Sequence, residues 1–266
     1  MKELLKRSLR EAGLEQPVRA VLWRASNFGL HYECPFCHGR LKGFLPGGED
    51  HPVLRQFEVV GGGYRPGCTC PLCGSVDRER LVYLFLQHRP QLLPRGARLL
   101  HVAPEAKLEE WLRAPSVDYL TADLIDPHAD VHFDLRAIPY DSARFEAVIA
   151  NHILEHIPED TQAMSEIHRV LTPGGWAILQ VPISLKLAFT DEDPSVTDPA
   201  ERERRFGQND HVRIYTAADY TARLARVGFE VEAFNWEANA EFGGADNRYG
   251  LLRKETLFFC RKRLAA

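Results

Sequence analysis

Residues 145–181 read FEAVIANHILEHIPEDTQAMSEIHRVLTPGGWAILQV and carry the clearest sign of the fold class. The apolar runs at 145–150 and 176–181 each predict a buried β-strand. Between them, apolar residues recur at helical spacing after Pro158, and the turn at 172–175 ends that helix. Two apolar strands joined by a helix predict a parallel sheet with crossover helices, so the chain is expected to have an α/β fold.

The alternation of strands and helices continues on both sides of this segment. A helix is expected from Thr216 to Gly228, because Thr216 followed by Asp219 is typical of a helix start. Further strands are predicted at residues 98–102, 117–121, 131–133, 229–234 and 256–261. All of these strands lie beyond Pro94, so one sheet is expected to organise that part of the chain.

The residues before Pro94 differ from this pattern in composition and spacing. Apolar positions within 1–26 recur at helical spacing and predict an amphipathic helix, which Pro17 can interrupt. Residues 27–75 are rich in Gly, Pro and Cys, which is typical of turns rather than of a regular core. Ser75 is then expected to cap a helix that runs to about residue 88.

Two cysteine knuckles of the same form, Cys34-Pro-Phe-Cys37 and Cys70-Pro-Leu-Cys73, lie in this N-terminal region. Their spacing predicts four thiolates around one structural, tetrahedral Zn²⁺. Disulfides fit poorly with a chain in which no export signal is apparent. Cys68 competes with Cys70 for the fourth position. The other residues that could substitute as ligands are His31, His38 and His51. The remaining cysteine, Cys260, is expected to be a core residue.

These features predict two domains. Residues 1–94 are expected to form a helical and zinc-binding domain, and residues 95–266 a larger domain. The polar stretch at about 185–212 interrupts the second domain and is expected to be a lid or substrate loop.

Composition narrows the class of protein. The 266 residues are 45% apolar and 26% charged, with a net charge of −4, which is typical of a globular protein. No apolar run reaches the roughly 20 residues that a membrane crossing needs, so we expect a cytoplasmic protein without a membrane partner. Residues 1–94 hold 13 Lys and Arg against 9 Asp and Glu, a small excess for a nucleic-acid binder.

The larger domain resembles the class I, UbiE-like or "type 11", S-adenosylmethionine-dependent methyltransferases. The resemblance rests on Asp134-Leu135, on HILEHI at 152–157 after the fourth strand, and on RVLTPGG at 169–175 before the fifth. A subgroup of that family carries a preceding pair of cysteine knuckles, and the whole chain resembles it. The resemblance implies a Rossmann-like, seven-stranded methyltransferase sheet preceded by the small zinc-binding domain.

The resemblance also implies a site for S-adenosylmethionine. Asp123 would bind the ribose hydroxyls, and Asp134 or the backbone of Leu135 would contact the adenine. The full set of expected cofactor contacts is His101, Ala103, Pro104, Glu105, Asp123, Leu124, Asp134, Leu135 and Asn151. The loop after the first strand departs from the family, because it reads HVAPE at 101–105 and lacks the usual glycines. Either the altered loop still binds the cofactor or the fold has lost it.

Three residues are candidates for the chemistry. Methyl transfer needs an aligned nucleophile and, where that nucleophile must lose a proton, a base. His152 follows the fourth strand and His211 follows the insertion, and either is a candidate base. Arg213 could bind an anionic group of the substrate. Bland alternatives are that His211 braces the lid, that Arg213 neutralises nearby carboxylates and that His156 packs under the sheet.

The function predicted is methyl transfer to a small molecule or glycan-type metabolite at oxygen, nitrogen or carbon. One alternative gives the zinc domain an RNA partner, with Tyr64, Arg65, Arg78 and Arg80 as contacts. Another is a non-catalytic, zinc-dependent interaction module on a degenerate methyltransferase fold. The sequence determines neither the substrate nor the oligomeric state.

Overall fold

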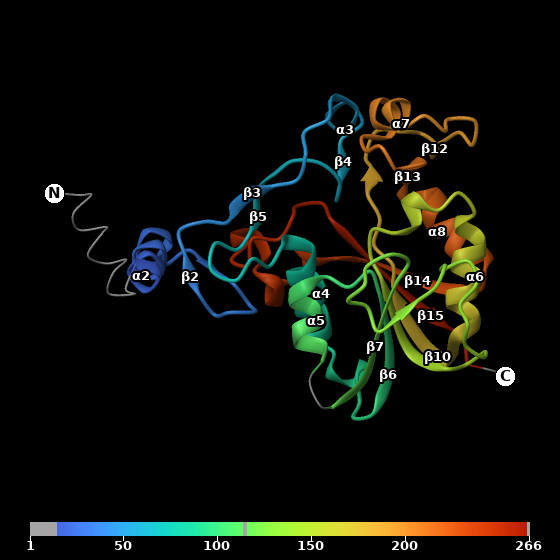
Figure 1. The fold of residues 1–266 in the computed structure, drawn as a ribbon, viewed down its shortest axis with the longest axis horizontal. Coiled ribbons are helices and arrows are strands. Elements are labelled where there is room, and N and C mark those ends of the chain that lie inside the picture. The colour runs from blue at the N-terminus through green and yellow to red at the C-terminus, as the bar shows by residue number, and fades with distance from the viewer. Residues whose placement is uncertain (1–14, 114–115, 265–266) are drawn as a thin grey trace.

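The computed structural model describes residues 15–113 and 116–264, and it contains a seven-stranded sheet with the order β14-β15-β10-β9-β6-β7-β8 (Figure 1). The strands are β6 (Ala97–Val102), β7 (Val117–Asp123), β8 (Val131–His132), β9 (Phe145–Ala150), β10 (Leu171–Ile178), β14 (Phe229–Asn235) and β15 (Thr256–Lys262). Strand β15 is antiparallel to both of its neighbours, whereas β6 to β10 are parallel. The α/β fold and all seven predicted strands are confirmed, but residues 172–175, expected to form a turn, lie within β10, because the preceding helix already ends at Val170.

Helices cover both faces of the sheet. Successive strand residues point to opposite sides, so each strand contributes side chains to both faces. On one face, Leu100 and its neighbours pack against α6 (Asp160–Val170) and α8 (Ala217–Arg226). On the other face, Leu99 and its neighbours pack against α4 (Asp77–Gln87) and α5 (Ala106–Leu112). Burial on both faces explains why the parallel strands are nearly continuous apolar runs.

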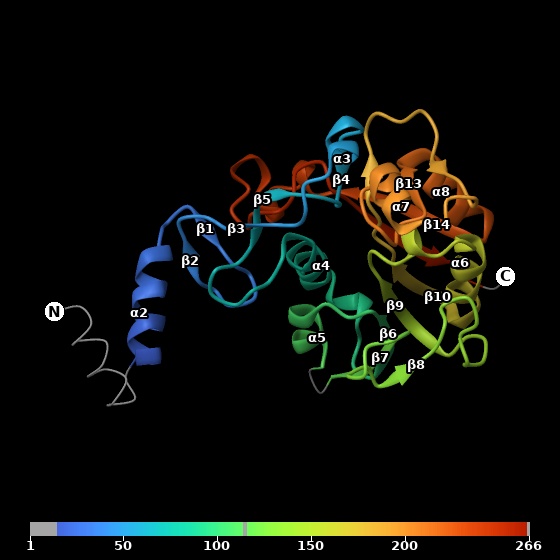
Figure 2. The same ribbon diagram turned by 45° about the horizontal axis from the view of Figure 1, so that its top comes forward.

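The N-terminal region extends from one end of the sheet (Figure 2). It comprises α2 (Glu15–Asn27), the hairpin of β1 (Tyr32–Glu33) and β2 (Arg40–Leu41), the pair β3 (Leu45–Gly47) and β5 (Arg65–Thr69), and α3 (Pro52–Gln56). The prediction of a helix at 1–26 is met by α2 for its last part, and residues 1–14 lie outside the described residues.

A second sheet joins the N-terminal region to the 185–212 insertion. Its order is β12-β13-β11-β4, formed by β4 (Val59–Val60), β11 (Ile183–Ser184), β12 (Asp191–Glu192) and β13 (Arg213–Thr216). The insertion also carries α7 (Pro199–Phe206), which lies beside α3 (Figure 1). The division at residue 94 stays a prediction, but α4 on its N-terminal side already packs on the large sheet.

Arg80 ties the two parts of the chain together. Its guanidinium is fully buried and donates to the carbonyls of Ser75, Cys68, Tyr249 and Gly250. A buried cation is stable only when its donors are satisfied, so these four carbonyls hold the knuckle region against the C-terminal segment.

The predicted cap of α4 is wrong. Val76 is the N-cap residue, and its N–H donates to the Glu79 carboxylate at 2.7 Å. The Ser75 hydroxyl instead lies 3.3 Å from the Cys34 Sγ and 3.4 Å from the Cys73 Sγ. No helix within the described ranges is long and apolar enough to cross a membrane.

Candidate active site and side-chain clusters

The strand order of the large sheet reverses between β6 and β9, since the chain runs outward through β7 and β8 and then returns to β9. Ligands of parallel α/β sheets bind beyond the carboxyl ends of the strands at such a reversal. Ala103 follows β6 with φ of 46°, and His152 follows β9 with φ of 55°. Non-glycine residues in this left-handed region cost free energy, and such positions cluster at functional sites.

A cavity of about 250 Å³ lies at these strand ends. Five of the predicted cofactor contacts line it, namely Ala103, Asp123, Leu124, Asp134 and Leu135. Ala103 has the positive φ that favours glycine, so this loop forms a left-handed turn although it lacks the glycines that the resemblance leads us to expect.

The two carboxylates of this cavity, Asp123 and Asp134, differ in how many of their oxygens already have hydrogen-bond partners. The Asp123 Oδ1 accepts from the N–H groups of Ile125 and Asp126 at 2.8 and 2.9 Å, which leaves Oδ2 for a ligand. Asp134 forms a two-pronged ion pair with Arg136, whose hydrogen bonds lower the pKa of Asp134. The Leu135 backbone is therefore the freer contact for an adenine.

Four predicted cofactor contacts lie outside both the 250 Å³ cavity and the larger one described next, namely His101, Pro104, Glu105 and Asn151. His101 is fully buried and bridges the Tyr119 hydroxyl at 2.8 Å and the Glu105 carboxylate at 2.9 Å. Asn151 donates to the other oxygen of Glu105 at 3.3 Å. Burial alone would raise the pKa of Glu105, but the hydrogen bond and charge of His101 outweigh it and lower that pKa. These hydrogen bonds hold the loop after β6 in place through the buried side chains of His101, Glu105 and Asn151.

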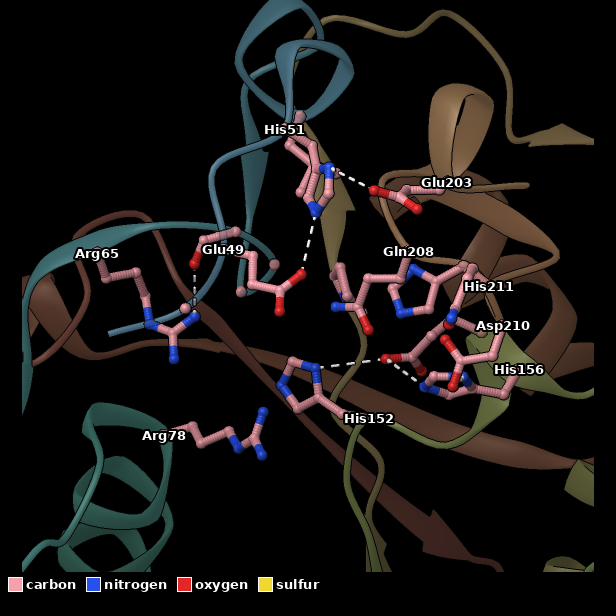
Figure 3. Close-up of a pocket in the computed structure, with 18 residues that line it drawn as sticks. Glu49, His51, Arg65, Arg78, His152, His156, Glu203, Gln208, Asp210 and His211 are labelled. Carbon is pink, nitrogen blue, oxygen red and sulfur yellow. Dashed lines mark hydrogen bonds and ion pairs between the residues drawn. The ribbon is translucent and has the colours of Figure 1, made fainter. Parts of the chain in front are cut away.

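A second, larger cavity of about 520 Å³ lies over the end of β9 (Figure 3). The N-terminal region supplies one wall through residues 48–65, and the insertion supplies another through Glu203 and 208–211. His51 connects these walls, with its ring nitrogens 3.2 Å from Glu49 and 3.7 Å from Glu203. His156 is in the lining of both cavities, so the two cavities are neighbours.

Histidine and carboxylate side chains gather at the floor of the larger cavity (Figure 3). The Glu155 carboxylate lies 3.4 Å from the His152 Nδ1 and 4.0 Å from the His156 Nε2. The rings of His156 and His211 meet edge to face at a centroid distance of 4.6 Å. The structure therefore brings both predicted histidines, His152 and His211, into one cluster with Glu155 and His156.

The protonation of this cluster follows from its burial. Burial lowers the pKa of His211 to about 4, against the opposing charge of Glu155, so this imidazole is neutral at neutral pH. Burial would raise the pKa of Glu155, but the hydrogen bond from His152 and the neighbouring imidazoles lower it. Glu155 is accordingly a buried carboxylate among imidazoles.

Polar atoms without partners are concentrated at this place. Among the described residues, the buried side-chain atoms that lack a hydrogen-bond partner are Arg78 Nε, His152 Nε2, Glu155 Oε2 and Gln180 Oε1. Three of these residues line the larger cavity, and the backbone carbonyl of Gln180 accepts from the His152 N–H at 2.7 Å. Buried polar groups are rarely left unpaired, so these atoms make the floor of the cavity a candidate ligand-binding surface.

Arg213 does not line either of these two cavities. Its buried guanidinium donates to the carbonyls of Leu154, Ile157 and Pro158 and pairs with Glu192. This placement matches the bland alternative in part, since Arg213 neutralises a carboxylate and also holds the loop after β9.

Sequence reasoning missed Glu155 and His156 as members of the site. The sequence favours packing for His156, although the HILEHI segment that contains both residues is part of the family resemblance. His51 is singled out by the sequence only as a possible zinc ligand and Glu203 not at all, because these two residues meet only through the folding of distant segments.

The four knuckle cysteines also converge. Their Sγ atoms lie within 4.8 Å of one another, with Cys34 and Cys73 at 3.6 Å and Cys37 and Cys70 at 3.9 Å. Both knuckles form the same loop, since the N–H of the fifth residue donates to the carbonyl of the first cysteine in each. Cys68 lies apart, where its sulfur contacts Arg65 and Asp77. The geometry therefore favours Cys70 over Cys68.

Comparison with known proteins identifies the family. A family model described as a methyltransferase domain matches residues 81–233, which is more than half of the chain. A Mycolicibacterium smegmatis protein, named as a probable S-adenosylmethionine-dependent methyltransferase, is 30% identical over 107 residues. That alignment covers 40% of this chain and 37% of the relative, so the chain spans well under half of the relative's length.

Solved structures share the fold. The [4+2]-cyclase SpnF superposes with a TM-score of 0.50 at 17% identity, over 82% of this chain and all (100%) of SpnF. An S-adenosylmethionine-dependent methyltransferase from Archaeoglobus fulgidus gives a TM-score of 0.45 at 11% identity, over 69% and 94% of the two chains. Because one of these proteins is a cyclase, the fold alone does not assign the reaction. The matched residues include the strand ends that form the smaller cavity, and the chain belongs to the class I, S-adenosylmethionine-dependent methyltransferase domain family.

Proposed function

We propose that this chain is an S-adenosylmethionine-dependent methyltransferase of the UbiE-like type that acts on a small molecule or glycan-type metabolite. The observation that carries the proposal is that two cavities are neighbours, with His156 in the lining of both. One cavity has the size and lining for an adenosyl group, and the other is polar and bounded on several sides. A donor in the first and an acceptor in the second would meet at the end of β9.

The residues of the smaller cavity fit the cofactor. The free Oδ2 of Asp123 suits the ribose hydroxyls, and the backbone of Leu135 suits the adenine edge. The left-handed turn at Ala103 would let the backbone approach the methionine end of a bound cofactor. When bound, S-adenosylmethionine supplies an activated methyl group, and these residues hold and orient it.

His152 is the proposed base for an acceptor that must lose a proton. Its Nδ1 is oriented by Glu155, while its Nε2 is buried, unpartnered and part of the wall of the larger cavity. A histidine oriented by a carboxylate and open at its other nitrogen is arranged for proton abstraction. Arg213 is a positioning residue, since it binds the loop that carries Glu155 and His156.

The cysteine cluster is proposed to hold one structural Zn²⁺. Tetrahedral thiolates around zinc, at Zn–S distances of about 2.3 Å, lie about 3.8 Å from one another. The two observed sulfur–sulfur contacts of 3.6 and 3.9 Å fit that spacing. With all four positions filled by thiolates, the metal stabilises the knuckle region and does no chemistry. The six free cysteines suit a reducing compartment, which supports a cytoplasmic location.

The RNA alternative has less support. Arg80 is committed to four carbonyls, and Arg65 pairs with Asp77 at 2.8 Å. Two of the three expected arginine contacts thus have their donors engaged within the chain, whereas the Arg78 Nε has no hydrogen-bond partner among the described residues and Tyr64 is exposed.

The test of the proposed function is calorimetry with S-adenosylmethionine and S-adenosylhomocysteine, followed by a metabolite screen with labelled methyl donor. We expect micromolar binding of both nucleosides and label transfer to a small acceptor. Absence of binding at millimolar cofactor would contradict the proposal and favour the non-catalytic interaction module.

A further inference from the structure

The described residues contain a second group of metal-ligating side chains besides the four cysteines. Glu155, His156 and His211 each offer one ligand atom, and these atoms lie within 4.8 Å of one another. We propose that Glu155, His156 and His211 bind one divalent transition-metal cation at the floor of the larger cavity. The metal would be distinct from the zinc assigned to the cysteine knuckles.

The ligand-bearing segments are held together by the backbone. The Val212 N–H donates to the Glu155 carbonyl at 2.9 Å, which joins the residue after His211 to the loop of the other two ligands. Arg213 binds the carbonyls on both sides of that loop, at Leu154 and Ile157. A metal site needs its ligands held by rigid surroundings, and these contacts supply them.

The His156 ring is oriented as metal-bound imidazoles usually are. Its Nδ1 lies 3.2 Å from the Asp210 carboxylate, while its Nε2 faces Glu155 at 4.0 Å. A histidine ligand commonly donates its second N–H to a carboxylate, which fixes the ring and makes the other nitrogen a better ligand. Ligand atoms bound to one cation at about 2.0–2.2 Å lie closer together than these do, so small side-chain rotations would close the site.

The unpartnered carboxylate oxygen of Glu155 supports a bound cation at this place. Glu155 is only 2% exposed, and its Oε2 has no hydrogen-bond partner. An ionised carboxylate that is buried without a full set of partners is costly. A cation between Glu155, His156 and His211 would satisfy that oxygen and use the imidazole nitrogens.

The ligand types select the class of metal. Two imidazoles and one carboxylate suit Zn²⁺, Fe²⁺, Co²⁺ or Ni²⁺ better than Mg²⁺ or Ca²⁺, which prefer oxygen ligands alone. Three protein ligands leave coordination positions open, and these face the cavity of about 520 Å³. The site therefore differs from the closed thiolate cluster, because it can accept a ligand from outside.

The open positions indicate a substrate class, and this step rests on the proposed function. An acceptor hydroxyl, such as that of a sugar, would bind the cation through its oxygen. A bound cation lowers the pKa of such a hydroxyl, and the released proton would pass to the unpartnered Nε2 of His152. The acceptor is thus inferred to be methylated at oxygen.

The test uses the full chain with its knuckle zinc in place and Co²⁺ as the probe. We expect one further equivalent of Co²⁺ to bind and to give weak visible absorption without sulfur-to-metal charge transfer. The variants His211→Ala and Glu155→Gln should each weaken Co²⁺ binding at least about tenfold. His51→Ala is the matched control, because His51 lines the same cavity outside the cluster and should leave Co²⁺ affinity unchanged.

Thermal unfolding of each variant separates a lost ligand from a lost fold, and Glu155→Gln preserves the side-chain volume. Co²⁺ binding that is equally tight in wild type and His211→Ala, or that shows only sulfur charge transfer, would overturn the metal proposal. Binding of S-adenosylhomocysteine is measured separately, by calorimetry without added metal. Nucleoside binding without Co²⁺ binding removes only the metal site, and Co²⁺ binding without nucleoside binding removes only the proposed methyl transfer.

Discussion

The cysteine cluster and the histidine cluster contain similar numbers of metal-ligating groups but differ in their surroundings. The four thiols face one another and line neither of the two site cavities, and Cys34, Cys70 and Cys73 pack in one cluster with Leu41 and Phe44. The histidines and Glu155 face a large polar cavity and leave buried atoms unpartnered. A cluster whose four ligand positions can all be filled by thiolates is saturated and suits a stabilising metal. A cluster with unpartnered buried atoms beside a cavity is unsaturated and can accept a ligand.

The largest expected effect falls on the saturated cluster. Cys34→Ser removes one thiolate, and we expect zinc loss and destabilisation by about 5 kcal/mol or more, since structural zinc binding is worth about 10–16 kcal/mol. Metal analysis and thermal unfolding measure this. Cys68→Ser is the matched control, because Cys68 lies outside the cluster and should keep the zinc. Equal zinc content in the Cys34→Ser variant would break the comparison.

The next effect falls on the unsaturated cluster and concerns rate rather than stability. His152→Ala should lower turnover by about 10²–10⁴-fold, the usual contribution of a positioned base. Cofactor affinity, measured by calorimetry, should change by less than about twofold, because His152 does not line the smaller cavity. Unchanged turnover would remove His152 from the chemistry.

A smaller effect is expected at the cofactor cavity next to the histidines. Asp123→Asn keeps an acceptor for the turn but loses the negative charge at Oδ2, and we expect about tenfold weaker binding of S-adenosylhomocysteine. Asp126→Asn is the control, since Asp126 caps the next turn outside the cavity and should bind normally. Equal affinities for both variants would refute the ribose contact.

The smallest effect concerns Glu255, a buried carboxyl behind the histidine cavity that accepts from Gln180 at 3.3 Å. Burial, with the charge of Asp77, raises the pKa of Glu255 to about 8. The folded state therefore keeps a proton that the unfolded state releases above about pH 4.3, so this contribution to stability is lost as the pH rises toward 8.

Glu255→Gln removes that loss. We expect the variant to unfold about 2–4 °C above wild type at pH 8.5, which is about 1 kcal/mol for a chain of this size. The gap should close toward pH 5, where wild-type Glu255 is protonated in the fold. A pH-independent difference would mean that Glu255 is ionised throughout.

The amino-acid sequence determined the seven strands, the helices α6 and α8 between them and the two cysteine knuckles, but not the short helix α5. These features are local, because strand periodicity, turn residues and C-x-x-C spacing act over a few residues. The strand ends at Asp123, Asp134 and His152 were predictable for the same reason, since parallel strands present their carboxyl ends at one edge.

Only the tertiary structure decided which of those residues share a cavity. His101 lies within β6 and Glu105 follows that strand shortly after Ala103, yet both join a buried network while Ala103 lines the smaller cavity. The roof formed by His51 and Glu203, and the convergence of His211 on Glu155, join segments far apart in the chain. Such contacts depend on how the second sheet pairs β11 with β4 and with β13, and long-range pairing leaves no local pattern in a single sequence.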